Sequence, residues 1–429
     1  MEYHNLKEVG HFLQKQRKEK GYSLQKMAEI TGIPSSTLWR IEQGTVRDKE
    51  KIQKVATSLG LFVDDLMKKI KKEDITETKR NLEAIENSIN IGHKLKDDLE
   101  LLKEFELESK HPLYPFWLFL KAKTFFYMKK YQKAERIAKS VICLEPNKLN
   151  MVPLSYNILA NVAYVRNELT SALELIEQAI DLFDREGERQ EQYYVFLMNK
   201  VSYLEKLDRL EEGETIIEEV ITNSHKLIKA KNRANSYELY AKVMFKKSPR
   251  KALEIATHGL FIASENFLPE RVIELRTLLG DIYKKLGKLD DAKIEYEEAL
   301  SLFDHVQTKS LFVSAYTSLG YLQLKSGELE QAKYSFSQAV KIGKEKEDSR
   351  YLDALIGLAQ WYITVGRSNE AIPSLKKALE IAQHQGNKHK QLKIILKLTQ
   401  CYQSDRGQFF NYLESLQRNL LELEDENDF

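Results

Sequence analysis

The feature that most constrains the fold is a recurring close-packing position, 38 to 41 residues apart, that runs from residue 122 to residue 399. The clearest copy covers residues 273–303, where Gly280 lies on an apolar helical stripe and Gly287 supplies a turn. A second helix then carries Ala292, Tyr296 and Ala299 at spacings of four and three residues. Small residues let two helix backbones approach closely, so the pattern predicts a helical hairpin with the Tyr296 ring in the groove. The repeated positions are Ala122, Ala160, Val201, Tyr240, Gly280, Gly320, Ala359 and Thr399.

This alternation of small and aromatic positions resembles the tetratricopeptide repeat. The second helices repeat a small residue as well, at Ala134, Ala172, Gly213, Ala252, Ala292, Ala332 and Ala371, whereas the last unit has Asn411 there. Stacked hairpins of this kind form a right-handed superhelix, so we expect an all-α chain whose first helices line a concave face. The amphipathic segment 81–108 is expected to cap the array.

Charge is unevenly distributed along the 429 residues, although the net charge is only +2. Residues 1–72 contain 15 Lys and Arg against nine Asp and Glu, which points to a polyanionic partner for this end. Cys143 and Cys401 are expected to be reduced thiols in the core of a cytoplasmic protein. The most apolar run, residues 115–120, is too short to cross a membrane.

The first 70 residues are expected to form five short helices. A helix over residues 6–20 ends at Gly21, and Ser23 caps the next. Ala28, then Gly32 four residues later, then apolar Ile33, Leu38 and Ile41 form the helix-turn-helix pattern.

Leu13, Arg17 and Gly21, followed by SLQKMAEITGIPSSTLWRIEQG, resemble the Xre/Cro repressor type of DNA-binding domain over residues 6–70. The resemblance implies that the second helix of the motif enters the major groove of a double-stranded DNA operator. It also implies an ion pair between Arg17 and Glu42 inside the domain rather than two DNA contacts. The DNA-contact candidates it gives are Gln25, Lys26, Ser35, Ser36, Thr37, Trp39, Arg40, Thr45, Arg47 and Lys49.

Two of these assignments leave alternatives open. Trp39 departs from the small polar residue common at its position, and it either packs on sugar and phosphate or covers the edge of the core. Ser36 and Thr37 are either DNA contacts or ordinary polar residues in the first turn of a helix. Residues 71–80 are expected to be a solvated helical linker, followed by eight to nine hairpins over residues 81–429.

Polar and aromatic residues offset from the packing stripe are expected to project into the concave groove. Asn157 and Asn161 are one turn apart, and a side-chain amide can both donate to and accept from a peptide backbone. The peptide-contact candidates are Asn157, Asn161, Tyr164, Ser202, Tyr237, Asp281, Thr317, Tyr321 and Gln360; any one of them alone could equally be a solvated polar residue.

A repressor-type domain joined to such repeats is similar to the peptide-pheromone receptors of Gram-positive bacteria, the group typified by Rap, NprR, PlcR and PrgX. The resemblance implies a homodimeric transcriptional regulator whose groove binds a short signalling oligopeptide, with a response-regulator protein as a further possible partner. A peptide that favours one superhelical pitch would then change the spacing of two paired DNA-binding domains.

Two other classes compete with this interpretation. An enzyme is disfavoured because the sequence has no phosphate loop, no paired cysteine motif and no metal-spaced histidines, and no cofactor is expected. Rap-type phosphatase activity is disfavoured because residues 75–110 contain no Gln. A protein-interaction scaffold with a vestigial DNA-binding domain remains the alternative.

Overall fold

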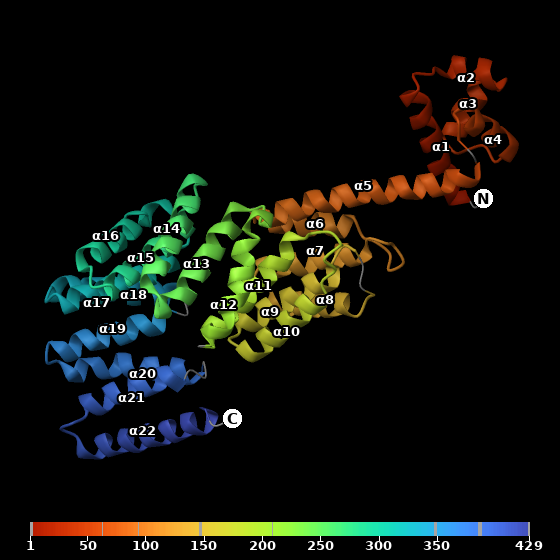
Figure 1. The fold of residues 1–429 in the computed structure, drawn as a ribbon. Helices are drawn as coiled ribbons and strands as arrows, with labels where there is room; N and C mark the ends of the chain where they lie inside the picture. The colour runs from red at the N-terminus through yellow and green to blue at the C-terminus, as the bar shows by residue number, and fades with distance from the viewer. Residues whose placement is uncertain are drawn as a thin grey trace. The chain divides into compact units, whose positions relative to one another are not determined.

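The computed structural model describes residues 3–61, 63–92, 94–145, 148–207, 209–346, 350–384 and 388–427. This part of the chain is helical throughout and contains no strand, as the sequence predicted. It divides into two compact units, residues 1–159 and residues 160–429. The stacked helices of each unit can be followed along the chain in Figure 1.

Four short helices at the N-terminus enclose a hydrophobic core of their own. They are α1 (Tyr3–Glu19), α2 (Leu24–Thr31), α3 (Ser35–Glu42) and α4 (Lys49–Ser58). Leu13 is fully buried in this core, and Met27 and Leu38 are nearly so. Gly21 and Gly32 have φ values of 70° and 66°, so each turn uses the left-handed conformation that glycine adopts at least cost. The expected helix boundaries are therefore confirmed to within a few residues.

The fifth helix and the helical linker expected at residues 71–80 form one continuous helix. Helix α5 (Val63–Ile91) runs without a break through the segment 71–80 and ends before Gly92, whose φ is 79°. No Gly or Pro interrupts these 29 residues, so nothing in the sequence ends the helix earlier. The C-terminal half of α5 packs with α6 (Leu95–Glu104), which forms the expected atypical first hairpin.

The remaining helices follow one another as antiparallel hairpins of the tetratricopeptide type. They are α7 (Tyr114–Tyr127), α8 (Tyr131–Ile142), α9 (Met151–Val165), α10 (Leu169–Asp181), α11 (Glu191–Lys206), α12 (Leu210–Thr222), α13 (Ala230–Lys247), α14 (Pro249–Glu265), α15 (Pro269–Lys285), α16 (Leu289–Ser301), α17 (Phe312–Lys325), α18 (Leu329–Lys346), α19 (Tyr351–Thr364), α20 (Ser368–His384), α21 (Lys388–Cys401) and α22 (Arg406–Asn427). Odd-numbered members are the first helices of the hairpins, and even-numbered members are the second.

The repeated small positions are where the helices touch. Ala292 and Ala299 are fully buried, and so are Ala332 and Ala371 in later hairpins. A Cβ added at Gly280 would lie 2.4 Å from the Tyr296 ring, so only glycine allows this ring to fill the groove between α15 and α16. The hairpin predicted for residues 273–303 is therefore confirmed, and Asn411, which departed from the pattern, is exposed.

The two cysteines do not occupy the expected core positions. Cys143 is exposed and Cys401 is half-buried, and both are free thiols. Their apolar neighbours in the sequence suggested burial, but Cys143 lies at the C-cap of α8, where the helix leaves the core. Within the described residues, no helix is both long and apolar enough to span a bilayer.

Candidate functional site

Helices α2 and α3 are joined by a tight turn that holds them at a fixed angle. The Ser23 hydroxyl caps α2 by accepting from the Lys26 N–H at 3.0 Å. At its other end the Gly32 N–H donates to the Ala28 carbonyl at 2.8 Å. The Ser35 hydroxyl donates to the Leu24 carbonyl at 3.4 Å and so ties the start of α3 to the start of α2. The local sequence therefore places α3 as a rigid, projecting helix.

A buried ion pair holds α1 to α3. The Arg17 guanidinium donates to both carboxylate oxygens of Glu42, at 2.6 Å from Nε and 3.0 Å from Nη2, and Nη1 donates to the Tyr22 carbonyl at 2.6 Å. Both residues are less than 9% exposed. The hydrogen bond to Glu42 raises the pKa of Arg17. Arg17 and Glu42 are therefore structural residues, as expected from the sequence, and neither faces a ligand.

The exposed face of α3 consists of predicted DNA-contact residues. Ser36 and Arg40 are exposed, and Trp39 is 53% exposed, so most of its indole is open to solvent. Thr37 is half-buried, and Ser35 is engaged with α2 as described. A hydroxyl, an indole and a guanidinium therefore project from one short helix.

The other predicted DNA contacts flank this face. Gln25 and Lys26 are exposed at the start of α2, where Lys26 pairs with Glu29 at 3.1 Å. Thr45, Arg47 and Lys49 are exposed beyond α3, and the Thr45 hydroxyl donates to the Arg40 carbonyl at 2.9 Å. Basic and hydroxyl groups on both sides of a projecting helix suit contact with a phosphate backbone.

The predicted peptide contacts on α9 meet a tyrosine that the sequence prediction missed. The Tyr203 hydroxyl on α11 donates to Asn161 Oδ1 at 3.1 Å, and the Tyr164 ring stacks on the Tyr203 ring with centroids 5.0 Å apart. Asn157 and Asn161 are both half-buried on α9. Tyr203 lies next to Ser202, which was predicted instead, but the Ser202 hydroxyl bonds to the Met198 carbonyl of its own helix.

Two predicted residues, Tyr237 and Asp281, form contacts between helices. The Tyr237 ring meets the His258 imidazole edge-on at 4.5 Å, within the hairpin of α13 and α14. Asp281 accepts from the hydroxyls of Tyr296 at 2.7 Å and Ser318 at 3.0 Å, which ties α15 to α16 and α17. Its carboxylate also accepts from Lys284 at 3.1 Å.

The last three predicted residues lie on α17 and α19. Thr317 is only 7% exposed and donates to the Val313 carbonyl. The Tyr321 ring packs edge-on against Phe336 at 5.0 Å. Gln360 accepts from Lys397 and donates to the Thr364 hydroxyl at 3.4 Å. A position offset from the packing stripe does not by itself distinguish a peptide contact, because the same positions also form links between neighbouring hairpins.

Charged residues that the sequence prediction did not select gather on the first helices of the second unit. We call them the inner cluster; they are Glu205, Lys206, Glu238, Lys242, Arg271, Glu274 and Arg350. Lys242 pairs with Glu238 at 3.0 Å and with Glu205 at 3.7 Å. Arg271 pairs with Glu238 at 3.0 Å and with Glu274. The ion pairs therefore run continuously across α11, α13 and α15.

The inner cluster also brings together helices that are far apart in the chain. Lys206 at the end of α11 lies within electrostatic range of Lys242, of Lys390 on α21 and of Arg350 just before α19. Arg350 in turn acts on Tyr164 of α9 and on Glu238 and Glu274. These side chains therefore lie within range of one another's charges, although α9 and α21 are not neighbours in the stack.

The pKa values of two carboxyl groups in the cluster are shifted in opposite directions. Burial raises the pKa of Glu274 to about 7, and the neighbouring Glu238 charge adds to the effect. Burial acts the same way on Glu238, but Lys242 and Arg271 outweigh it and lower the pKa of Glu238. No local signal in the sequence distinguishes these residues, because α13 and α15 carry other charged residues as well.

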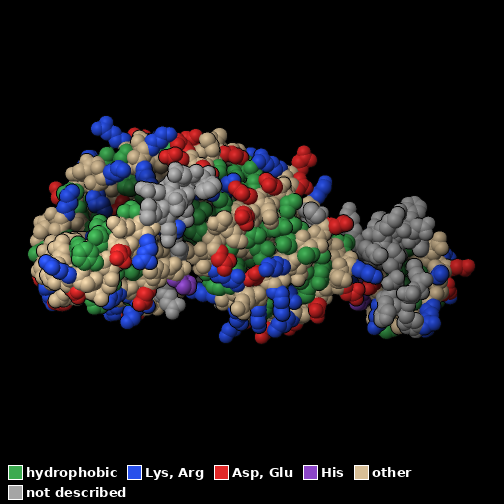
Figure 2. All heavy atoms as spheres, turned by 90° about the horizontal axis from the view of Figure 1, so that it is seen from below, with side chains coloured by type: hydrophobic (Ala, Val, Ile, Leu, Met, Phe, Trp, Pro, Cys, Tyr) green, Lys and Arg blue, Asp and Glu red, His purple; other side chains and the backbone are tan. Residues whose placement is uncertain are grey.

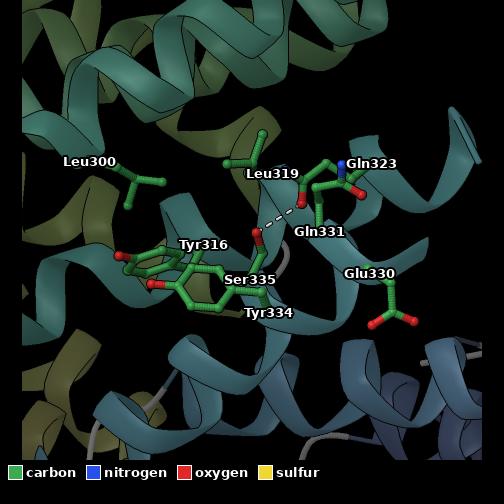
Figure 3. Close-up of a pocket in the computed structure, with 8 residues that line it drawn as sticks. All are labelled: Leu300, Tyr316, Leu319, Gln323, Glu330, Gln331, Tyr334 and Ser335. Atoms are coloured by element: carbon green, nitrogen blue, oxygen red, sulfur yellow. Dashed lines mark hydrogen bonds between the residues drawn. The ribbon is translucent and has the colours of Figure 1, made fainter. Parts of the chain in front are cut away.

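A separate pocket of about 510 Å³ opens between α16 and α18, with α17 beneath it. Figure 3 shows the Tyr316 and Tyr334 rings on one side of it and the Ser335 hydroxyl donating to Gln323 Oε1, a distance of 2.8 Å. None of the nine predicted peptide contacts lines it.

Figure 2 shows basic and acidic side chains interspersed with hydrophobic ones over one face of the molecule. Charged side chains of both signs are therefore mixed over that face, and neither sign dominates it.

Comparison with known proteins supports the repeat architecture. Tetratricopeptide-repeat families match residues 273–304 and 311–384, and the family of anaphase-promoting complex subunit 5 matches residues 158–226. No curated protein matches the sequence.

Solved structures similar in fold include a Rap protein and the quorum sensor NprR. A Rap protein complexed with competence and sporulation factor is 13% identical, with a TM-score of 0.62, over 83% of this chain and 98% of that one. The apo form of the quorum sensor NprR from B. thuringiensis is 16% identical, with a TM-score of 0.60, over 81% and 99%. NprR in complex with its cognate peptide NprX is 15% identical, with a TM-score of 0.54, over 72% and 93%. The chain therefore has the all-α, tetratricopeptide-like superhelical fold of these proteins.

Proposed function

We propose that the chain is a DNA-binding transcriptional regulator controlled by a short oligopeptide, and that it is not an enzyme. In this proposal residues 1–70 are a helix-turn-helix domain of the Xre/Cro type, and α3 is its recognition helix. The repeats bind the peptide on their inner surface. The observation that carries the proposal is the exposed face of Ser36, Trp39 and Arg40 on a domain with its own core, in a chain whose repeats bear an inner charged cluster.

The geometry supports DNA contact because some charged side chains of the domain are paired in its interior, whereas others are exposed on α3. Arg17 and Glu42 neutralise each other inside the domain, which leaves the exposed Arg40 for a base edge or a phosphate. A helix-turn-helix protein reads two half-sites when it forms a dimer, so we expect a homodimer on a two-fold symmetric operator. We expect it to act in the cytoplasm, where the DNA is.

The fold likeness supports a peptide as the effector. One of the similar structures is the quorum sensor NprR with its cognate peptide NprX, and another is a Rap protein with competence and sporulation factor. In this chain Asn157, Asn161 and Tyr164 on α9 are half-buried, so they combine amide and aromatic groups with partial access. Such groups can hold an extended backbone, as in other peptide-recognition grooves.

DNA binding is tested with duplexes selected from a randomised library by the full chain. We expect the affinity to fall steeply with salt, because each phosphate contact releases counterions, and to fall at least tenfold in Arg40→Ala. An exposed control that is not itself a predicted DNA contact is Glu50→Ala, which removes a negative charge and should bind at least as tightly as the unaltered chain. A flat salt response and no effect of Arg40→Ala would favour a protein-interaction scaffold.

A further inference from the structure

The hairpin of α17 and α18 lacks an aromatic ring that the hairpins on either side of it have. Three residues after the close-packing position of the first helix, those two hairpins carry Tyr283 and Tyr362. Both rings pack against hydrophobic core clusters of the array. The same position in the hairpin between them is Gln323. This hairpin is therefore missing the volume of one phenol ring.

A second position in the same hairpin has also lost volume. In the preceding hairpin, Arg276 on α15 donates to Glu295 on α16 at 2.9 Å, and the two side chains cover the contact between these helices. The corresponding residues, forty positions later, are Tyr316 and Ser335. Serine has no carboxylate, and its hydroxyl donates to Gln323 instead. The pocket of about 510 Å³ lies at these substituted positions (Figure 3).

The walls of this pocket suit a planar apolar group. Leu300 and Leu319 supply aliphatic surface, and the rings of Tyr316 and Tyr334 stand beside one another at one side. Aromatic rings attract one another in offset or edge-on arrangements. Sites for small molecules have mostly apolar and aromatic walls, a few polar groups and volumes of about 300–1,000 Å³. The pocket therefore has the size and composition to hold a compound with one aromatic ring.

One hydrogen-bond donor in the pocket has no acceptor. Gln323 is only 7% exposed, and its Oε1 accepts from the Ser335 hydroxyl at 2.8 Å. Its Nε2 forms no hydrogen bond within the described residues. A largely buried donor without an acceptor is unfavourable, and a ligand oxygen would remove that cost. The group that matches the pocket therefore combines an aromatic ring with an oxygen.

We propose that this pocket is a binding site for a phenol-type ligand. The ligand ring lies against the leucine and tyrosine side chains, and its oxygen accepts from Gln323 Nε2. The ligand thus takes the place of the tyrosine ring that Tyr283 and Tyr362 supply in the neighbouring hairpins. None of the predicted peptide contacts lines the pocket, so this site is separate from the peptide site and does not depend on it.

The test is ligand-observed NMR of the full chain with p-cresol, which is the tyrosine side chain without its backbone. We expect saturable binding with a dissociation constant of about 1 mM or lower, as is reasonable for a single ring. Gln323→Tyr restores the ring of the neighbouring hairpins and should abolish this binding. Its melting temperature should be at least that of the unaltered chain, because filling a cavity commonly stabilises a protein. The matched control is Gln400→Tyr, which changes an exposed glutamine on α21 and should bind as the unaltered chain does.

A second variant tests the amide and keeps the experiment decisive if a tyrosine does not fit at position 323. Gln323→Leu keeps a similar volume but removes the donor. It should lower the affinity for p-cresol relative to that for toluene, which has no oxygen, by about 3- to 10-fold.

N-acetyltyrosine amide distinguishes the two sources of such a ring. Binding at least as tight as that of p-cresol would support the site and identify a tyrosine side chain of a polypeptide as its ligand. Weaker binding than that of p-cresol would support the site and identify a free phenol.

Two results would overturn the proposal. One is the absence of saturable p-cresol binding by the unaltered chain. The other is unchanged binding of p-cresol by both Gln323→Tyr and Gln323→Leu, because the ring would then bind elsewhere.

Discussion

The Arg17–Glu42 pair gives a sharp test of how the N-terminal domain divides its charged residues between structure and binding. Arg17→Met removes one partner of an ion pair with contacts of 2.6 and 3.0 Å and leaves the Glu42 carboxylate in a site that is 4% exposed. It also removes the donor to the Tyr22 carbonyl. Breaking a buried pair in this way costs about 3–5 kcal/mol. We expect a cost near the lower end, since α1 ends close to the pair and can adjust.

Hydrogen exchange of the full chain, read by mass spectrometry over α1–α4, measures this cost locally. A loss of about 3 kcal/mol corresponds to roughly 100-fold faster exchange of amides that need the domain to open. Exchange in the repeats should not change. Arg40→Met is the matched control, because it removes an exposed guanidinium from α3. It should leave exchange unchanged and weaken DNA binding.

The reverse pattern would refute the reasoning. If Arg17→Met left exchange within twofold of the unaltered chain but weakened DNA binding, Arg17 would be a DNA contact rather than a structural residue. If Arg40→Met accelerated exchange across α1–α4, the exposed face of α3 would be part of the fold. Glu42→Gln, which keeps the shape and removes the charge, should resemble Arg17→Met with a smaller effect.

Three further predictions follow from the repeats. Gly280→Ala places a methyl group 2.4 Å from the Tyr296 ring, so we expect a loss of about 1–3 kcal/mol in calorimetry of the full chain, and an unchanged melting temperature would contradict this close packing. The folded pKa of Glu274 is about 7, above the ordinary value of 4.5, so its contribution to stability is present below pH 4.5 and lost as the pH rises through 7. The unfolding free energy should therefore fall between pH 5 and pH 8, and it should fall by up to about 3 kcal/mol more in the unaltered chain than in Glu274→Gln. Parallel curves of unfolding free energy against pH would refute the raised pKa of Glu274. Tyr203→Phe removes the hydroxyl that donates to Asn161, and urea unfolding should show a loss of about 1 kcal/mol; a gain in stability would indicate that the contact is strained.

Helix periodicity and small residues were enough to predict most of the fold. The positions from Ala122 to Thr399 all lie in the first helices of hairpins, because only small or well-fitted side chains allow those helices to cross. The helical linker predicted for residues 71–80 is helical, but it is continuous with the fifth helix. No Gly or Pro lies in the segment, so the helix has no reason to end there.

The site was predicted less completely than the fold. The Arg17–Glu42 pair was predicted correctly because the motif that contains it is local and its spacing is specific. On the inner surface, Asp281 and Thr317 were selected by helical position alone, yet both are held by neighbouring side chains or backbone. The inner cluster was missed because it depends on contacts between α11, α13, α15 and the start of α19, up to 145 residues apart between Glu205 and Arg350. No local pattern encodes such distances.

The central claim, that an inner-surface peptide controls a DNA-binding domain, is tested most directly by one titration. The full chain is bound to its selected duplex at a fixed salt concentration, and a heptapeptide selected by the full chain from a random library is added until binding saturates. The account predicts that the dissociation constant for DNA changes at least tenfold, in either direction. A DNA affinity that stays constant at saturating peptide would contradict it.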